Sequence, residues 1–89
     1  MGEVAAKMKV MPETIETDLN ELKEKLRAAV PEGVEVYGEI IEEPVAFGLK
    51  ALIITIIVGD QEGGTEAVEE AFANVPGAEN VQILELGRL

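Results

Sequence analysis

Apolar and polar residues alternate at the start of the chain and run together without alternation near its middle. Every second residue from Val4 to Val10 is apolar, which predicts a strand with one buried face. We expect this strand to end at Met11-Pro12, because proline has no backbone N–H to donate to a sheet. Residues 49–58 are apolar on both parities, which is typical of a central strand covered on both faces.

Two segments show the spacing of amphipathic helices. Apolar residues recur every three or four positions across residues 19–30, and Asp18 stands three residues before Glu21, the spacing of a capping box. Glu21 and Lys25 are placed for an ion pair along this helix. A shorter pattern of the same kind covers residues 65–74 and predicts a second helix that stops before a Pro-Gly pair.

Two further strands are predicted, one before the apolar run and one after the second helix. Residues 34–41 alternate, and we expect an edge strand with a bulge at Gly38 that ends at Glu42-Glu43-Pro44. Residues 59–64 form a loop, and residues 81–86 form the last strand.

The predicted order is therefore strand, helix, strand, strand, helix, strand. This is the split βαβ, or ferredoxin-like, α+β arrangement, a four-stranded antiparallel sheet with two helices on one face. The connections are short, so residues 1–89 are expected to form a single domain. A chain of 89 residues buries only about 60% of its unfolded surface, which leaves one modest core and disfavours a deep active-site cleft.

The charge balance narrows the classes of partner. The chain has 18 acidic and 7 basic residues, a formal net charge of -11. A basic face for nucleic acid or for an anionic membrane is therefore not expected. The longest apolar stretch is also far shorter than the ~20 residues that a membrane helix requires. We expect a soluble, cytoplasmic protein without direct nucleic-acid or membrane contact.

The side chains that most often carry catalysis are missing. The sequence has no cysteine and no histidine, which excludes disulfides, thiol catalysis and zinc-thiolate sites. Glu42-Glu43 and Glu69-Glu70 are adjacent pairs, and neighbouring side chains point apart on a strand or helix. No metal site and no cofactor are expected.

Three positions remain as candidates for binding. Gly63-Gly64-Thr65 could hold an anion at the start of a helix, although the flanking glutamates favour a plain loop that leads into an N-cap. Phe47 lies in a proline-led loop beside a glycine, where it is either a plug of the core or an exposed binding anchor. Arg88 is the only cation after Lys50, and composition alone assigns it no role.

Several segments together resemble a known family. Residues 44–52, Pro-Val-Ala-Phe-Gly-Leu-Lys-Ala-Leu, and the apolar strand that ends at residues 58–60 are similar to the exchange domain of the elongation factor 1-beta family. Gly64-Thr65 before an acidic helix, and a last strand that closes in a basic residue and leucine, agree with it. Residues 11–13, Met-Pro-Glu, fit the free-standing archaeal form. The resemblance covers essentially the whole chain.

This resemblance implies a guanine-nucleotide exchange factor for the GTPase elongation factor 1-alpha, which carries aminoacyl-tRNA to the ribosome. It implies binding to the GDP-bound or nucleotide-free GTPase, as a monomer when free, without covalent chemistry. The residues that it implies in binding and exchange are Phe47, Gly48, Lys50, Arg88 and Leu89.

The resemblance also implies separate roles for two of these residues. Phe47 corresponds to a loop phenylalanine that packs against the GTPase. Arg88 stands where eukaryotic relatives have a lysine that reaches toward the magnesium and phosphate side of the nucleotide pocket. On this hypothesis we expect Phe47 and Arg88 to be exposed on one side of the domain.

A second hypothesis is a ferredoxin-like regulatory module that binds a small molecule. It predicts a monomer–dimer equilibrium and a glycine-lined pocket near Gly63 and Gly64. An enzyme of the acylphosphatase type is set aside, because it needs an arginine in the loop after the first strand, where Pro12, Glu13 and Thr14 stand.

Overall fold

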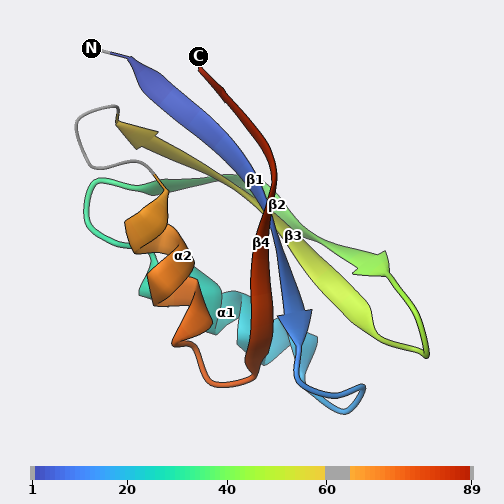
Figure 1. The fold of residues 1–89 in the computed structure, drawn as a ribbon. Coiled ribbons are helices and arrows are strands. Elements are labelled where there is room, and N and C mark those ends of the chain that lie inside the picture. The colour runs from blue at the N-terminus through green and yellow to red at the C-terminus, as the bar shows by residue number, and fades with distance from the viewer. Residues whose placement is uncertain (1, 60–64, 89) are drawn as a thin grey trace.

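Four strands and two helices follow one another in the predicted order (Figure 1). The computed structural model describes residues 2–59 and 65–88, without the side chain of Arg88. The elements, in chain order, are β1 (Glu3–Pro12), α1 (Leu19–Ala29), β2 (Glu35–Pro44), β3 (Lys50–Gly59), α2 (Glu66–Ala73) and β4 (Ala78–Arg88).

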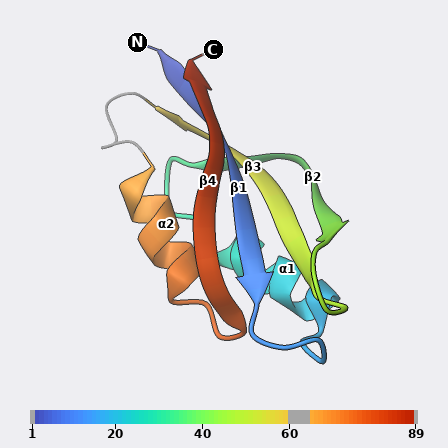
Figure 2. The ribbon, with the colours of Figure 1, turned by 45° about the vertical axis from the view of Figure 1, so that its right-hand side comes forward.

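The strands form one antiparallel sheet in the order β2-β3-β1-β4. This order and the βαββαβ connectivity define a ferredoxin-like α+β fold, which confirms the predicted fold class. β1 and β3 lie at the centre of the sheet and β2 lies at an edge, as the apolar patterns predict. Figure 2 shows both helices on the same side of the sheet.

The hydrophobic core fills the space between the helices and this face of the sheet. Leu22 and Leu26 of α1 and Val68 and Phe72 of α2 are almost wholly buried there. Each such side chain contributes on the order of 1.5–3 kcal/mol by burial. On the sheet they meet the alternate residues Ala6, Met8 and Val10 of β1 and Leu52, Ile54, Ile56 and Val58 of β3.

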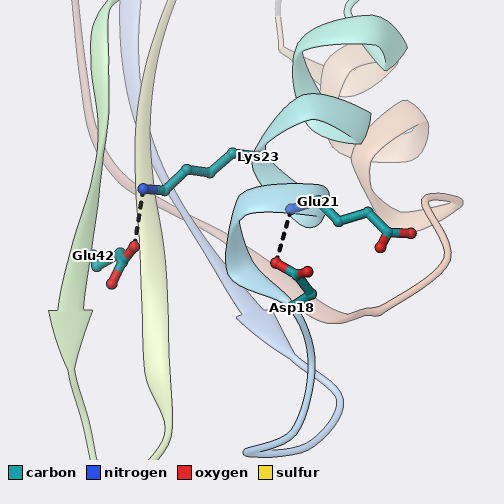
Figure 3. Close-up of polar contacts among 4 residues, drawn as sticks. All are labelled: Asp18, Glu21, Lys23 and Glu42. Atoms are coloured by element: carbon teal, nitrogen blue, oxygen red, sulfur yellow. Dashed lines mark hydrogen bonds and ion pairs between the residues drawn. The ribbon is translucent and has the colours of Figure 1, made fainter.

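α1 begins where the sequence predicts. The Asp18 carboxylate accepts a hydrogen bond from the backbone N–H of Glu21 at 3.2 Å, which satisfies one of the free donors of the first turn (Figure 3). The predicted ion pair between Glu21 and Lys25 is also present, at 3.1 Å. Both contacts are exposed, so they specify the start of the helix more than they stabilise the fold.

One strand ends where the sequence predicts and another extends further. β1 ends at Pro12, as expected, whereas β2 continues through Glu42 and Glu43 to Pro44. In each case the proline is the last residue of its strand, where a missing N–H removes little from the ladder. β4 is also longer than predicted and begins at Ala78.

The predicted bulge at Gly38 is confirmed. The register of β2 on β3 shifts between Tyr37 and Ile41, and Gly38 has φ 72°. A Cβ atom at Gly38 would have no atom within 4 Å. The position therefore favours glycine because of its backbone conformation and not because of lack of space.

The prediction that β3 is covered on both faces is wrong. Its core-facing residues lie under the helices, but both helices are on that side of the sheet. On the other side Ala51 and Ile53 are buried by their neighbours, while Thr55 and Ile57 are only half-buried. Because residues of both parities are apolar in β3, the sequence pattern does not show that no helix covers its second face.

The two phenylalanines allow a matched test of the core. Phe72 is 0% exposed, so Phe72→Ala should lower the free energy of unfolding by about 3–5 kcal/mol. Phe47 is 95% exposed, so Phe47→Ala should change it by less than about 0.5 kcal/mol. Urea unfolding followed by circular dichroism measures both. Equal losses at the two positions would contradict this description of the core.

Candidate functional site

The connection between β2 and β3 is a tight turn with Phe47 at its tip. The Leu49 N–H donates to the Ala46 carbonyl at 3.1 Å, and the Val45 N–H donates to the Leu49 carbonyl at 2.8 Å. Phe47 and Gly48, the two central residues, have φ values of 58° and 81°. These are the φ signs of a type I′ turn, which suits the twist of a hairpin.

Phe47 is an unusual residue for the first central position of this turn. Asn, Asp or Gly is preferred there, and a residue with a large side chain costs on the order of 1–2 kcal/mol in left-handed backbone. Phe47 recovers none of this by burial, because its side chain is 95% exposed. The interpretation of Phe47 as a core plug is therefore excluded, and its ring is presented to solvent at the end of the molecule.

The turn lies beside the loop that joins β1 to α1. A Cβ atom on Gly48 would lie 3.8 Å from Cγ2 of Ile15, which is an ordinary contact. Ile15 is itself 67% exposed. A shallow cavity of about 290 Å³ opens here between the two loops, and Gly48, Lys50 and Ile15 contribute to its lining. This end of the sheet thus combines two exposed apolar side chains with the exposed ammonium group of Lys50.

An ion pair holds β2 against α1 near the same end. Lys23 Nζ lies 2.9 Å from Glu42 Oε2 (Figure 3). The hydrogen bond from Lys23 is the largest effect that lowers the pKa of Glu42 from its ordinary value of 4.5, and the charges of Lys23 and Lys50 add to it. The Glu42 carboxylate is thus paired with a lysine of the same chain at the surface. No ion pair to Lys50 is found among the described residues.

Arg88 lies at the other end of the sheet. Its backbone pairs with Val4 near the start of β1, whereas Lys50 follows the turn close to the end of β1. The eight residue-to-residue steps from Val4 to Pro12 span about 26 Å at roughly 3.3 Å per step. Phe47 and Arg88 therefore belong to opposite ends of the sheet. The expectation that both side chains are exposed on one side of the domain stays a prediction, because the side chain of Arg88 lies outside the described part of the chain. The start of β1 and the end of β4 lie side by side, far from the turn between β2 and β3 (Figure 1).

The remaining candidates give little. Leu89, Gly63 and Gly64 lie outside the described residues, and with them the pocket that the regulatory-module hypothesis requires. Within residues 2–59 and 65–88 no group of acidic side chains is arranged to hold a metal ion. No helix in this part of the chain is long and apolar enough to cross a membrane.

Among the described residues, five exposed large apolar residues besides Phe47 were not singled out from the sequence: Ile15, Tyr37, Ile41, Leu84 and Leu86. Ile15 is the one apolar residue between Pro12 and Leu19, a signal that could have been noticed. Tyr37 and Ile41 of β2 are 66% and 60% exposed. Their exposure depends on the bulge at Gly38, because the bulge decides which residues of β2 face the helices.

Comparison with known proteins identifies the class. The profile of the EF-1 guanine nucleotide exchange domain matches residues 5–89. The chain belongs to this family, and it is a nucleotide exchange factor in translation elongation and not an enzyme. Family membership implies interaction with elongation factor 1-alpha.

Several archaeal proteins with one shared name are similar to the chain over its whole length. Elongation factor 1-beta of Methanosarcina acetivorans is 65% identical over 89 residues, which cover 100% of both chains. The proteins of the same name from Haloarcula marismortui and Methanothermobacter thermautotrophicus are 58% and 47% identical, and each is covered over 99% or more of its length. The similarity therefore extends to both ends of the sheet.

The Lys23–Glu42 pair predicts a pH dependence of stability. Because the pKa of Glu42 is lowered by folding, its contribution is complete above the ordinary value of 4.5 and is lost as the pH falls through the lowered pKa. Glu42→Gln should therefore unfold at lower urea concentration than the parent above pH 4.5, with the difference shrinking in more acidic solution.

Lys23→Met provides the matched control for this effect. It should remove the same pH-dependent part of the free energy of unfolding. The double variant should lose no more of this part than either single variant. A Glu42→Gln difference that is constant with pH would contradict the role of the pair.

Proposed function

We propose that the chain contacts elongation factor 1-alpha through both ends of its sheet and thereby releases GDP. The observation that carries this proposal is Phe47, an aromatic side chain held almost fully exposed on left-handed backbone. Strained backbone that carries an exposed side chain does not stabilise the fold. Such strain clusters at functional sites, where a contact with another molecule accounts for it. Membership of the exchange-domain family supports the GTPase as that contact.

Phe47 is the proposed anchor of the complex. Aromatic side chains that fill a pocket of the partner supply much of the binding energy of an interface. A type I′ turn closed by two backbone hydrogen bonds fixes the backbone that carries the ring before binding, so little backbone entropy is lost. Gly48 allows the turn, and Lys50 places a cation beside the anchor.

Arg88 is the proposed agent of GDP release. Magnesium that bridges the phosphates supplies much of the binding energy of the nucleotide in a GTPase of this kind. A cation brought near that site therefore competes with the magnesium ion. The resemblance supports this role, because Arg88 occupies the place of a lysine that acts there in eukaryotic relatives. Arginine keeps the charge but is a broader, planar group. Leu89 would follow it into the same contact.

The thermodynamics of exchange follow from linkage. A factor that weakens GDP binding must itself bind less tightly when GDP is present, and it leaves when GTP completes the site. In the cytoplasm the factor therefore meets the GDP-bound GTPase but binds the nucleotide-free GTPase more tightly. The factor acts as a monomeric single domain, and its charge of -11 steers it toward a basic surface of its partner.

Release of a fluorescent GDP analogue from archaeal elongation factor 1-alpha tests the proposal. The chain should accelerate release strongly, and Arg88→Ala should lower the maximal rate by about tenfold or more while the protein remains folded. Arg88→Lys should retain most of the rate. Arg27→Ala removes an exposed arginine of α1 and should have no effect.

A folded chain that fails to accelerate release would refute the exchange proposal. Full acceleration by Arg88→Ala would refute the role of Arg88 and would leave the exchange function standing.

Phe47→Asn separates binding from folding in the same assay. Asparagine suits a type I′ turn, so the free energy of unfolding should stay equal or rise by up to about 1 kcal/mol. The concentration for half-maximal release should nevertheless increase by roughly tenfold or more. Phe47→Tyr keeps the ring and should stay near the parent. Unchanged half-maximal concentration for Phe47→Asn would exclude the anchor.

A further inference from the structure

The loop that joins β1 to α1 contains a second turn with an exposed apolar residue. The Thr17 N–H donates to the Thr14 carbonyl at 3.3 Å, so Ile15 and Glu16 are the central residues of a four-residue turn. Ile15 is 67% exposed at the first central position. Phe47 occupies the same position of the turn between β2 and β3, so both turns present a large apolar side chain in the same way.

Hydrogen bonds hold this second turn in place. The Thr14 N–H donates to Oγ1 of Thr17 at 3.2 Å, and the Glu16 N–H donates to Oγ1 of Thr14 at 3.1 Å. The Glu13 N–H donates to the Gly77 carbonyl at 3.0 Å, which ties the loop to the connection between α2 and β4. The backbone of the turn is therefore fixed in the free protein, so little backbone entropy is lost on binding.

The fold itself makes little use of the Ile15 side chain. Ile15 belongs neither to the hydrophobic core nor to the partly buried residues packed against it. It also stands three residues before the N-cap Asp18, whereas an apolar residue that packs on the first turn of a helix directly precedes the cap. A single exposed apolar residue is common on protein surfaces, so the significance of Ile15 depends on what lies beside it.

Ile15 and the turn that carries Phe47 bound one shallow cavity. Cγ2 of Ile15 lies 3.8 Å from the position that a Cβ atom would take at Gly48, the residue after Phe47. The cavity between the two turns has a volume of about 290 Å³. Its lining is apolar at Pro12 and Leu19 and polar at Thr14 and Lys50. Apolar lining beside polar groups suits a single anchor side chain of another protein.

Family membership supplies the partner for this surface. The chain belongs to the exchange-domain family, which implies interaction with elongation factor 1-alpha. Because Ile15 lies against Gly48, a partner that covers Phe47 also meets Ile15. A second copy of the chain is a poorer occupant, because two molecules of net charge -11 repel each other.

We propose that Ile15 is a second contact residue for elongation factor 1-alpha, and that the cavity between the two turns takes an apolar side chain of that GTPase. This inference rests on the proposed function, and it adds the loop between β1 and α1 to the contact at Phe47.

Ile15→Ser tests the proposal in the release of fluorescent GDP from elongation factor 1-alpha. It should raise the half-maximal concentration roughly tenfold and leave the maximal rate unchanged, because it weakens binding alone. Ile15→Leu keeps an apolar side chain and should stay within about twofold of the parent. Ile41→Ser makes the same change at a 60% exposed position of β2, and it should also stay within about twofold.

The urea midpoint of Ile15→Ser should stay close to that of the parent, because the altered side chain is exposed. If the parent accelerates release and Ile15→Ser matches Ile41→Ser, Ile15 is not a contact residue, although the exchange function stands. If the parent fails to accelerate release, the exchange function itself fails. Sedimentation that shows a dimer of the free chain, dissociated by Ile15→Ser, would assign the cavity to a second copy and overturn the proposal.

Discussion

The pairing of β1 with both β3 and β4 is the constraint on which the geometry of this molecule depends. β1 lies at the centre of the sheet, and its alternate residues from Ala6 to Val10 are buried beneath the two helices. A shift of the β1 register by one residue would turn these side chains outward and would bring Lys7 and Lys9 into the core, so the register is strongly fixed. The register in turn separates the turn at Phe47 from the strand end at Arg88.

A rigid sheet with two distant ends suits a factor that does no covalent chemistry. The core is confined to one side of the sheet, and the functional candidates lie outside it, in the turn between β2 and β3 and at the end of β4. The strain at Phe47 is affordable because burial between the layers stabilises the fold independently of the turn. On the proposed function, stability and exchange therefore depend on different residues.

The order of the elements could be predicted from the sequence because each local signal agrees with the fold. The Asp18 cap, the bulge at Gly38 and the alternation in β1 are short-range features, and the structure shows all three. Strand ends were less predictable, because a proline is tolerated at the last position of a strand, as Pro44 shows.

The features that the sequence did not predict depend on contacts between distant residues. Residues of β3 are apolar on both parities, so their pattern could not show that one face lacks a helix. The pairing of Lys23 with Glu42 spans 19 positions, and the separation of Phe47 from Arg88 follows only from the antiparallel register. The resemblance to the exchange family supplied the site residues, which composition alone could not rank.

The central claim is that one GTPase is held at both ends of the sheet at once. The most direct test is the apparent second-order rate constant of GDP release for the double variant Phe47→Asn with Arg88→Ala, compared with both single variants. Contacts this far apart should contribute independently, so the fold losses of the single variants should multiply. A double variant no slower than the poorer single variant would contradict simultaneous contact.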